Sequence, residues 1–218
     1  MKSKQISKNE FHALLFDGAS IMIGGFMNVG TPNRLIQWLS DSNVQNLTII
    51  ANDAGYEDLG VGSLIKSGKV SRIIASHVGL NPLVGQLMAQ NKLEVNLVPQ
   101  GTLAEQIRSG GAGLGGVLTP TGIGTVVEKD KMIVTIEGEN YIVEKALKAD
   151  IALIYAEHGD DKGNLIYHRT AQNFNPLMAT AGHVVCAEIG MIYSVGTIDP
   201  DRIVTQHIFV DYYMSEAK

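Results

Sequence analysis

The segment from Asp17 to Pro32 constrains the fold of this 218-residue chain more than any other. It contains a short apolar run, residues 20–23, with the length and composition of a buried β-strand. Three glycines follow the run: Gly24, Gly25 and Gly30. Thr31 is the expected N-cap of a helix and Pro32 its expected first residue, because proline gives up no hydrogen bond there. The segment therefore predicts a strand, a glycine loop and a helix in immediate succession.

A glycine loop between a strand and a helix lets backbone N–H groups approach a ligand closely, with the positive end of the helix dipole behind them. This arrangement predicts a site for an anionic or phosphate-bearing ligand. A Walker A loop is excluded, because it needs Lys and then Ser or Thr after its last glycine, whereas Gly30 is followed by Thr and Pro. The dinucleotide pattern falls at Gly111, Gly113 and Gly116, after a helix-like segment instead of a strand, and is also rejected.

Composition limits the class of protein. Hydrophobic residues make up 45% of the chain and charged residues 18%, so we expect one compact α/β domain over residues 1–218. The net charge of −5 argues against nucleic acid or an anionic membrane as the main partner. Residues 1–10 are polar, and no apolar stretch approaches the roughly 20 residues of a membrane helix. We therefore expect a soluble, cytoplasmic protein.

Metal and thiol chemistry have little support in the sequence. The six histidines show no paired ligand spacing, and Cys186 is the single cysteine. We expect no metal site and no internal disulfide. Cys186 lies in the apolar run 184–187 and is predicted to be a buried thiol.

Apolar runs alternate with helix-like segments along the chain. Strands beyond the first are predicted at 47–51, 72–75, 93–98, 132–136, 151–156, 165–167, 183–189 and 208–210. Helices are predicted after the Ser7-x-x-Glu10 capping box, across 35–39, after Asn81-Pro82, from the Thr102-x-x-Glu105 capping box, and at 144–148. Continuous apolar strands between helices predict a mainly parallel open sheet covered by helices on both faces.

Four predicted strands end in polar or glycine-bearing loops. These exits are Gly24-Gly25, Asn52-Asp53, Ser76-His77 and Pro99-Gln100-Gly101. Because ligands of open α/β sheets bind beyond the carboxyl ends of the strands, we expect the four loops to line one cleft.

The segment from Asp17 to Pro32 resembles the signature of the family I coenzyme A transferases. That signature is Asp or Asn, Gly, an apolar run, Gly-Gly-Phe, three variable residues, Gly, one residue and Pro, and every element is present here. The resemblance extends along almost the whole chain, through Pro99-Gln100-Gly101-Thr102, Thr119-Pro120-Thr121-Gly122 and Asn173-Phe174-Asn175-Pro176. It is closest to alpha subunits of the bacterial acetate and butyrate–acetoacetate type. One departure is Thr205-Gln206-His207, where relatives show Thr-Pro-Gly.

The resemblance implies a fold, a reaction and site residues. It implies the open-sheet, isomerase-like fold of the family and transfer of coenzyme A (CoA) between a short-chain acyl-CoA and acetate, acetoacetate or butyrate. CoA is then a substrate, with no permanently bound cofactor. Gln100 is the residue expected to polarise the reacting carbonyl. The residues expected to contact CoA are Gly24, Gly25, Phe26, Met27, Asn28, Val29 and Gly30.

The resemblance also implies a partner subunit. In the family the nucleophile is a glutamate of the beta subunit in a Glu-x-Gly context, and the comparable region here reads Asn52-Asp53-Ala54-Gly55. The letters of Glu157-His158-Gly159 match the motif, but far along the chain, where a strand-end surface carboxylate is the simpler interpretation. We expect an inactive chain alone and a hetero-oligomer of two alpha and two beta chains.

Two alternatives from other functional classes stay open at this point. A single-chain enzyme of similar fold, such as a sugar-phosphate isomerase, would keep the glycine-rich site but carry its own acid and base. A non-catalytic subunit would bind CoA without transferring it. Assays with and without a candidate beta subunit distinguish the three.

Overall fold

The computed structural model describes residues 3–215. Its helices are α1 (Lys8–His12), α2 (Asn33–Asp41), α3 (Val61–Lys66), α4 (Pro82–Ala89), α5 (Gln100–Gly111) and α6 (Asn175–Ala181). Its strands are β1 (Ser20–Ile23), β2 (Leu47–Asp53), β3 (Val70–His77), β4 (Glu94–Leu97), β5 (Gly116–Thr119), β6 (Ile133–Ile136), β7 (Glu139–Lys145), β8 (Ala149–Asp160), β9 (Leu165–Ile166), β10 (Gly182–Tyr193) and β11 (Tyr212–Ser215). Short 3₁₀ turns lie at Val126–Glu128, Arg169–Gln172, Pro200–Arg202 and His207–Phe209.

The main sheet has the order β11-β10-β8-β1-β2-β3-β4, and all of these neighbours pair in parallel. β9 adds a short antiparallel pairing to β8. β1 lies near the middle, where Ile21 pairs with Ile49 of β2 and with Ile151 of β8. The glycine loop that follows β1 therefore leaves the sheet near its centre, at the edge where parallel strands end.

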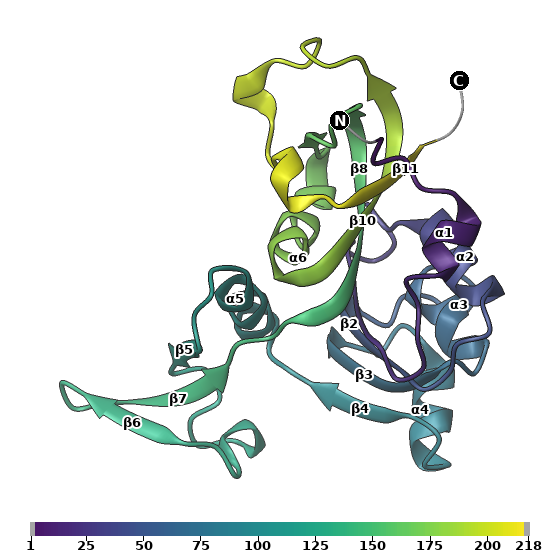
Figure 1. The fold of residues 1–218 in the computed structure, drawn as a ribbon. Helices are drawn as coiled ribbons and strands as arrows, with labels where there is room; N and C mark the ends of the chain where they lie inside the picture. Colours follow the sequence, from purple (N-terminus) through teal and green to yellow (C-terminus); the bar gives the residue numbers. More distant parts are fainter. Residues whose placement is uncertain (1–2, 216–218) are drawn as a thin grey trace.

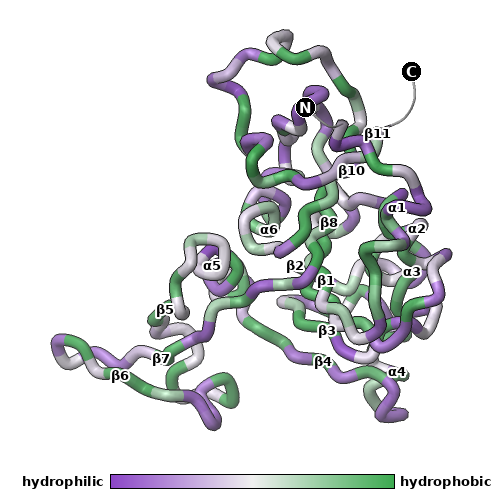
Figure 2. The backbone as a smooth tube through the Cα atoms, in the orientation of Figure 1, coloured by the Kyte–Doolittle hydropathy of each residue, from purple (hydrophilic) through white to green (hydrophobic). Residues whose placement is uncertain are grey.

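Helices cover both faces of this sheet, as the apolar strands predict. Side chains alternate between faces along a strand, so Ile21 and Ile23 pack with α1, α2, α3 and α4, whereas Met22 packs with α5 and α6. Both clusters are closed to solvent, and residues 151–154 of β8 are hydrophobic throughout, as the green part of the tube along β8 shows (Figure 2). Burial on both faces is the physical reason that these strands read as continuous apolar runs.

A second, antiparallel sheet has the order β5-β7-β6 and projects from the main body (Figure 1). It corrects the helix predicted at 144–148, because β7 runs through Lys145 and pairs with both β5 and β6. Glu144 faces inward next to Gln106 of α5, and its carboxylate accepts hydrogen bonds from Gln106 (3.1 Å) and Lys131 (2.5 Å). The strand predicted at 208–210 is also wrong: a 3₁₀ turn lies there, and β11 begins at Tyr212.

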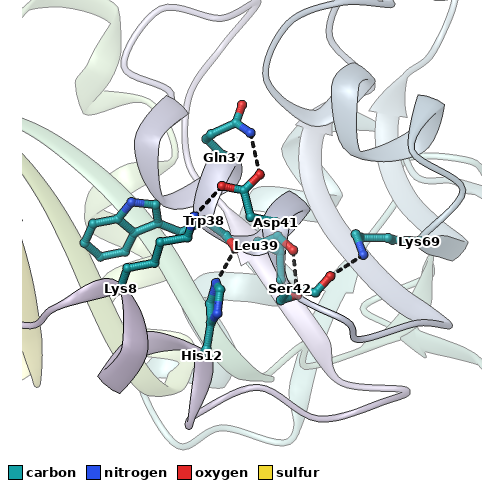
Figure 3. Close-up of polar contacts among 8 residues, drawn as sticks. All are labelled: Lys8, His12, Gln37, Trp38, Leu39, Asp41, Ser42 and Lys69. Atoms are coloured by element: carbon teal, nitrogen blue, oxygen red, sulfur yellow. Dashed lines mark hydrogen bonds and ion pairs between the residues drawn. The ribbon is translucent and has the colours of Figure 1, made fainter.

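Polar contacts from α1 on one side and from Lys69 on the other hold α2 in place (Figure 3). The Ser7–Glu10 capping box of α1 is confirmed. His12 Nε2 meets the Trp38 carbonyl at 2.7 Å, and Lys8 pairs with Asp41 at 2.6 Å, lowering the pKa of that exposed carboxyl. On the other side, the buried Lys69 ammonium donates to the Ser42 carbonyl (2.6 Å), just beyond the end of α2. These contacts hold the helix that follows the glycine loop.

Candidate active site

The glycine loop closes on itself as a two-residue hairpin. Phe26 N–H donates to the Val29 carbonyl (3.0 Å), and Val29 N–H donates to the Phe26 carbonyl (2.9 Å). Between them, Met27 and Asn28 have φ values of 45° and 67°. Positive φ at both central residues is the signature of a type I′ turn. The loop therefore projects a rigid turn beyond β1, with Met27 and Val29 exposed at its tip.

The loop glycines are required by packing inside the chain. A Cβ at Gly24 would lie 1.8 Å from Asn175 Oδ1, and one at Gly25 would lie 2.3 Å from Thr31 Oγ1. Gly25 also has φ +113°, a conformation that side chains resist. Gly30 has φ +70° and the same crowding, since its Cβ would lie 2.5 Å from the Cβ of Ala171. Close approach between segments thus explains the glycines, and contact with CoA stays a prediction.

The start of α2 differs from the sequence prediction. The helix begins at Asn33, with Pro32 as its N-cap and no side-chain hydrogen bond from the cap residue. The carboxylate of Glu188, on β10, instead accepts hydrogen bonds from Arg34 N–H (2.8 Å) and Leu35 N–H (3.2 Å). The protein's own carboxylate therefore lies at the positive end of this helix, and binding of an anionic ligand at the glycine loop stays a prediction. Burial raises the pKa of Glu188 above its ordinary 4.5.

The predicted meeting of strand-end loops is seen in a hydrogen-bonded network. The buried carboxylate of Asp53 accepts from Met27 N–H (2.9 Å), Gly55 N–H (2.8 Å) and Asn52 Nδ2 (2.8 Å). Asn52 Oδ1 accepts in turn from Gln100 Nε2 at 2.7 Å and from Ser76 Oγ at 3.2 Å. The network thereby joins four segments: the ends of β2 and β3, the glycine turn after β1, and the start of α5 after β4. A small pocket between the turn and the end of β2 is lined by residues of both.

Gln100 is the first residue of α5, with Pro99 as the N-cap, and it is exposed. One hydrogen of its Nε2 is used on Asn52, which ties down the loop, and a primary amide nitrogen carries two. The capping box predicted at Thr102 and Glu105 is wrong. Thr102 lies one turn too far into the helix, its hydroxyl is buried without a partner within residues 3–215, and Glu105 pairs with Arg108 (2.7 Å).

Residues outside the network have structural roles. Glu157 lies within β8, and its carboxylate accepts from the Tyr155 hydroxyl (3.0 Å); burial, followed by this contact, raises the pKa of Tyr155 to about 12. Cys186 is buried, as predicted, and burial raises the pKa of its thiol to about 12, so it is a poor nucleophile. Among residues 3–215, no three His, Cys, Asp or Glu side chains group as metal ligands would. In the same residues no helix is both long and apolar enough to span a membrane.

Two residues were missed by sequence reasoning. Glu188 reaches α2 from a distant strand. Asn175 binds the Gly30 carbonyl (2.9 Å) and the Tyr155 N–H (2.9 Å), so it links the glycine loop to β8. Asn175 lies in a segment of the family resemblance, which was the available signal, but no local pattern reveals either long-range contact.

Comparison with known proteins decides the family. A model of the coenzyme A transferase family matches residues 7–214. The chain belongs to this family. The Escherichia coli K12 protein named acetate CoA-transferase subunit alpha is 48% identical over 212 residues, 97% of this chain and 96% of that protein. The acetoacetyl-CoA:acetate/butyrate CoA transferase alpha subunit of Clostridium acetobutylicum is 45% identical over 99% of both chains.

Solved structures share the fold. Acyl-CoA transferase YdiF from E. coli O157:H7, in a thioester complex with CoA, matches with a TM-score of 0.88 and 23% identity. The match covers 98% of this chain and 50% of the YdiF chain. Glutaconate CoA-transferase from Acidaminococcus fermentans matches with a TM-score of 0.83 and 17% identity, over 98% of this chain and 75% of that one. The family resemblance and the open-sheet α/β fold predicted from the sequence are therefore confirmed.

Proposed function

We propose that this chain is the alpha subunit of a heteromeric CoA-transferase that moves CoA between a short-chain acyl-CoA and a carboxylate: acetate, acetoacetate or butyrate. Family membership and the alpha-subunit names of its relatives support the reaction class. The observation that carries the site is the network from Met27 through Asp53 and Asn52 to Gln100, which brings together the two segments expected to handle CoA and the reacting carbonyl.

The reaction has two half-reactions that are linked by a glutamyl–CoA thioester. A glutamate carboxylate of the beta subunit attacks the acyl-CoA carbonyl and expels the CoA thiolate, which forms a mixed anhydride. The thiolate then attacks the glutamyl carbonyl and expels the acyl group as a free carboxylate, leaving a glutamyl–CoA thioester. An incoming carboxylate reverses both steps. This chain supplies no glutamate at the equivalent strand end, where Asn52 and Asp53 stand.

In this scheme the chain binds CoA and stabilises charge. The turn from Gly24 to Gly30, Phe26 to Val29 included, contacts CoA, which is a substrate and not a resident cofactor. The second N–H of Gln100 donates to the carbonyl oxygen as it gains negative charge, an interaction typically worth ~10²–10³ in turnover.

A beta subunit completes the active site, and we propose an assembly of two alpha and two beta chains in the cytoplasm. The names of the relatives support a partner. Exposed apolar side chains support it independently: Val126 is 91% exposed, Met132 68% and Ile136 44%, all on or beside the projecting sheet. Permanent interfaces are rich in such surface.

The test is CoA transfer from acetoacetyl-CoA or butyryl-CoA to acetate, measured with this chain, with a candidate beta subunit, and with both co-purified. We expect turnover only from the complex. We also expect acyl-CoA to leave CoA bound covalently to the beta subunit as a thioester that hydroxylamine cleaves. An isomerase-like activity of this chain alone, or CoA binding by the complex without transfer, would overturn the proposal in favour of one of the two alternatives.

A further inference from the structure

The Asn52 amide joins the two halves of the candidate active site. Asn52 is the last residue but one of β2 and is 3% exposed. Its Nδ2 donates to Asp53 at 2.8 Å, and its Oδ1 accepts from Gln100 Nε2 at 2.7 Å. The Ser76 hydroxyl donates to the same Oδ1 at 3.2 Å and to the Asn52 carbonyl at 2.7 Å. Every polar atom of this side chain is therefore occupied by a neighbour.

The orientations of the Asn52 and Gln100 side-chain amides follow from one carboxylate. An ionised carboxylate only accepts hydrogen bonds, so Asp53 requires the NH₂ end of Asn52 to face it. The oxygen of Asn52 then faces Gln100, and Gln100 must present its own NH₂ end. Asp53 is itself held by the N–H groups of Met27 and Gly55. The orientation of the Gln100 amide is thus set two links away, by the residue that also anchors the glycine turn.

We propose that Asn52 is a positioning residue for the acyl transfer: it relays the orientation set by Asp53 to Gln100, so that Gln100 presents an N–H, and not its carbonyl oxygen, to the reacting group. The inference rests on the proposed function. Terminal amide torsions are broad and roughly two-fold, so an unrestrained Gln100 turns over easily. In the reversed orientation its Oε1 repels a developing oxyanion.

The first experiment is a double-mutant cycle on kcat in the co-purified complex, with Asn52→Ala, Gln100→Ala and the double variant. We expect Asn52→Ala to lower kcat by about 10- to 100-fold with little change in KM for acyl-CoA, a loss typical of misplaced catalytic groups. In the Gln100→Ala background the same change should cost less than about twofold, because the group that it positions is already gone. Additive losses in the double variant would overturn the proposal.

Two further variants separate positioning from loss of fold. Asp53→Asn preserves shape but lets the amide of Asn52 face either way, so it should lower kcat even if Asn52→Ala assembles poorly. Asn81→Ala is the matched control, because Asn81 is also buried and, within residues 3–215, its side chain binds the Ala54 carbonyl (3.2 Å) and the Leu83 N–H (3.2 Å) of helix α4 and no part of the network. It should lower Tm and leave kcat unchanged. An Asp53→Asn complex with wild-type kcat would contradict the relay.

A readout independent of turnover keeps the inference distinct from the proposed function. In crystal structures of the complex, Gln100 should keep its amide on Asn52 in the wild type and move or disorder in Asn52→Ala. If the wild-type complex transfers no CoA, the proposed function fails and this comparison alone tests the relay. An unmoved Gln100 side chain in Asn52→Ala would overturn the inference whatever the activity.

Discussion

At the scale of single residues, Gln100 has two possible roles that its kinetics separate. Its Nε2 holds Asn52, which is a structural contact, and its second N–H is the proposed oxyanion donor. We predict that Gln100→Ala lowers kcat by ~10²–10³ and changes KM for acyl-CoA little, because the second contact strengthens in the transition state. Steady-state kinetics with a parallel Tm measurement check this. A lower Tm with near-normal kcat would assign Gln100 to the loop alone.

Gly25 tests the packing of the glycine turn against the rest of the chain. We predict that Gly25→Val impairs folding, because the new side chain meets Thr31 and φ is +113°. Soluble yield and Tm of the co-expressed complex measure the effect, and a wild-type Tm would contradict it.

Val29, 49% exposed at the tip of the turn, is the cleaner probe of CoA contact. We predict that Val29→Glu raises KM for acyl-CoA about fivefold, from ~1 kcal/mol of repulsion between a carboxylate and the CoA phosphates a few ångströms away. Val29→Gln is the uncharged control of similar size, with KM close to that of the wild type. Equal KM values for the Glu and Gln variants would place CoA elsewhere.

At the scale of elements, the start of α2 depends on a carboxylate from β10. We predict that Glu188→Ala destabilises the complex by about 1–2 kcal/mol, the usual loss when a helix N-cap contact is removed. Glu188→Gln keeps an acceptor for the Arg34 and Leu35 N–H groups and should be much less damaging near pH 7. Chemical unfolding of the co-purified complex measures both.

The same carboxylate gives a pH dependence of defined sign. Because the folded-state pKa of Glu188 lies above 4.5, the folded protein keeps this proton at pH values where the unfolded chain has lost it. Its contribution to stability is therefore complete below pH 4.5 and decreases as pH rises through the folded-state pKa. We predict that the Tm of the wild type relative to Glu188→Gln falls over this interval and is level above it. A difference that increases with pH would contradict the assignment.

At the scale of the whole molecule, the projecting sheet is the feature that the main fold does not require. We predict that the co-expressed complex has the mass of two alpha and two beta chains, and that Met132→Glu lowers the fraction assembled, since it places a charge on exposed apolar surface. Light scattering coupled to size exclusion measures both. A monomeric wild-type chain that ignores the co-expressed beta subunit would contradict the prediction.

Patterns that are local in the chain were sufficient to predict much of this protein. Strand burial, positive φ and helix capping act over a few residues, so short segments are enough to predict them. Examples are the run 20–23, the three loop glycines and the Ser7–Glu10 capping box. The alternation of apolar strands and helices was enough to predict a parallel sheet covered by helices on both faces. Gln100 and the turn from Gly24 to Gly30 became candidate site residues through the family resemblance, which rests on motifs that are local in the chain.

Tertiary structure decided what depends on partners far along the chain. The sequence predicted a helix at residues 144–148, whereas the structure has the end of β7 there. The pairing of β7 with β5 and β6 outweighs weak local propensity. Thr31 and Thr102 are capping residues by type, yet Glu188 and Pro99 occupy those helix starts. The order of Met27, Asp53, Asn52 and Gln100 in one network could not be derived from spacing, because hydrogen-bond geometry is set only when separate strands come to rest side by side.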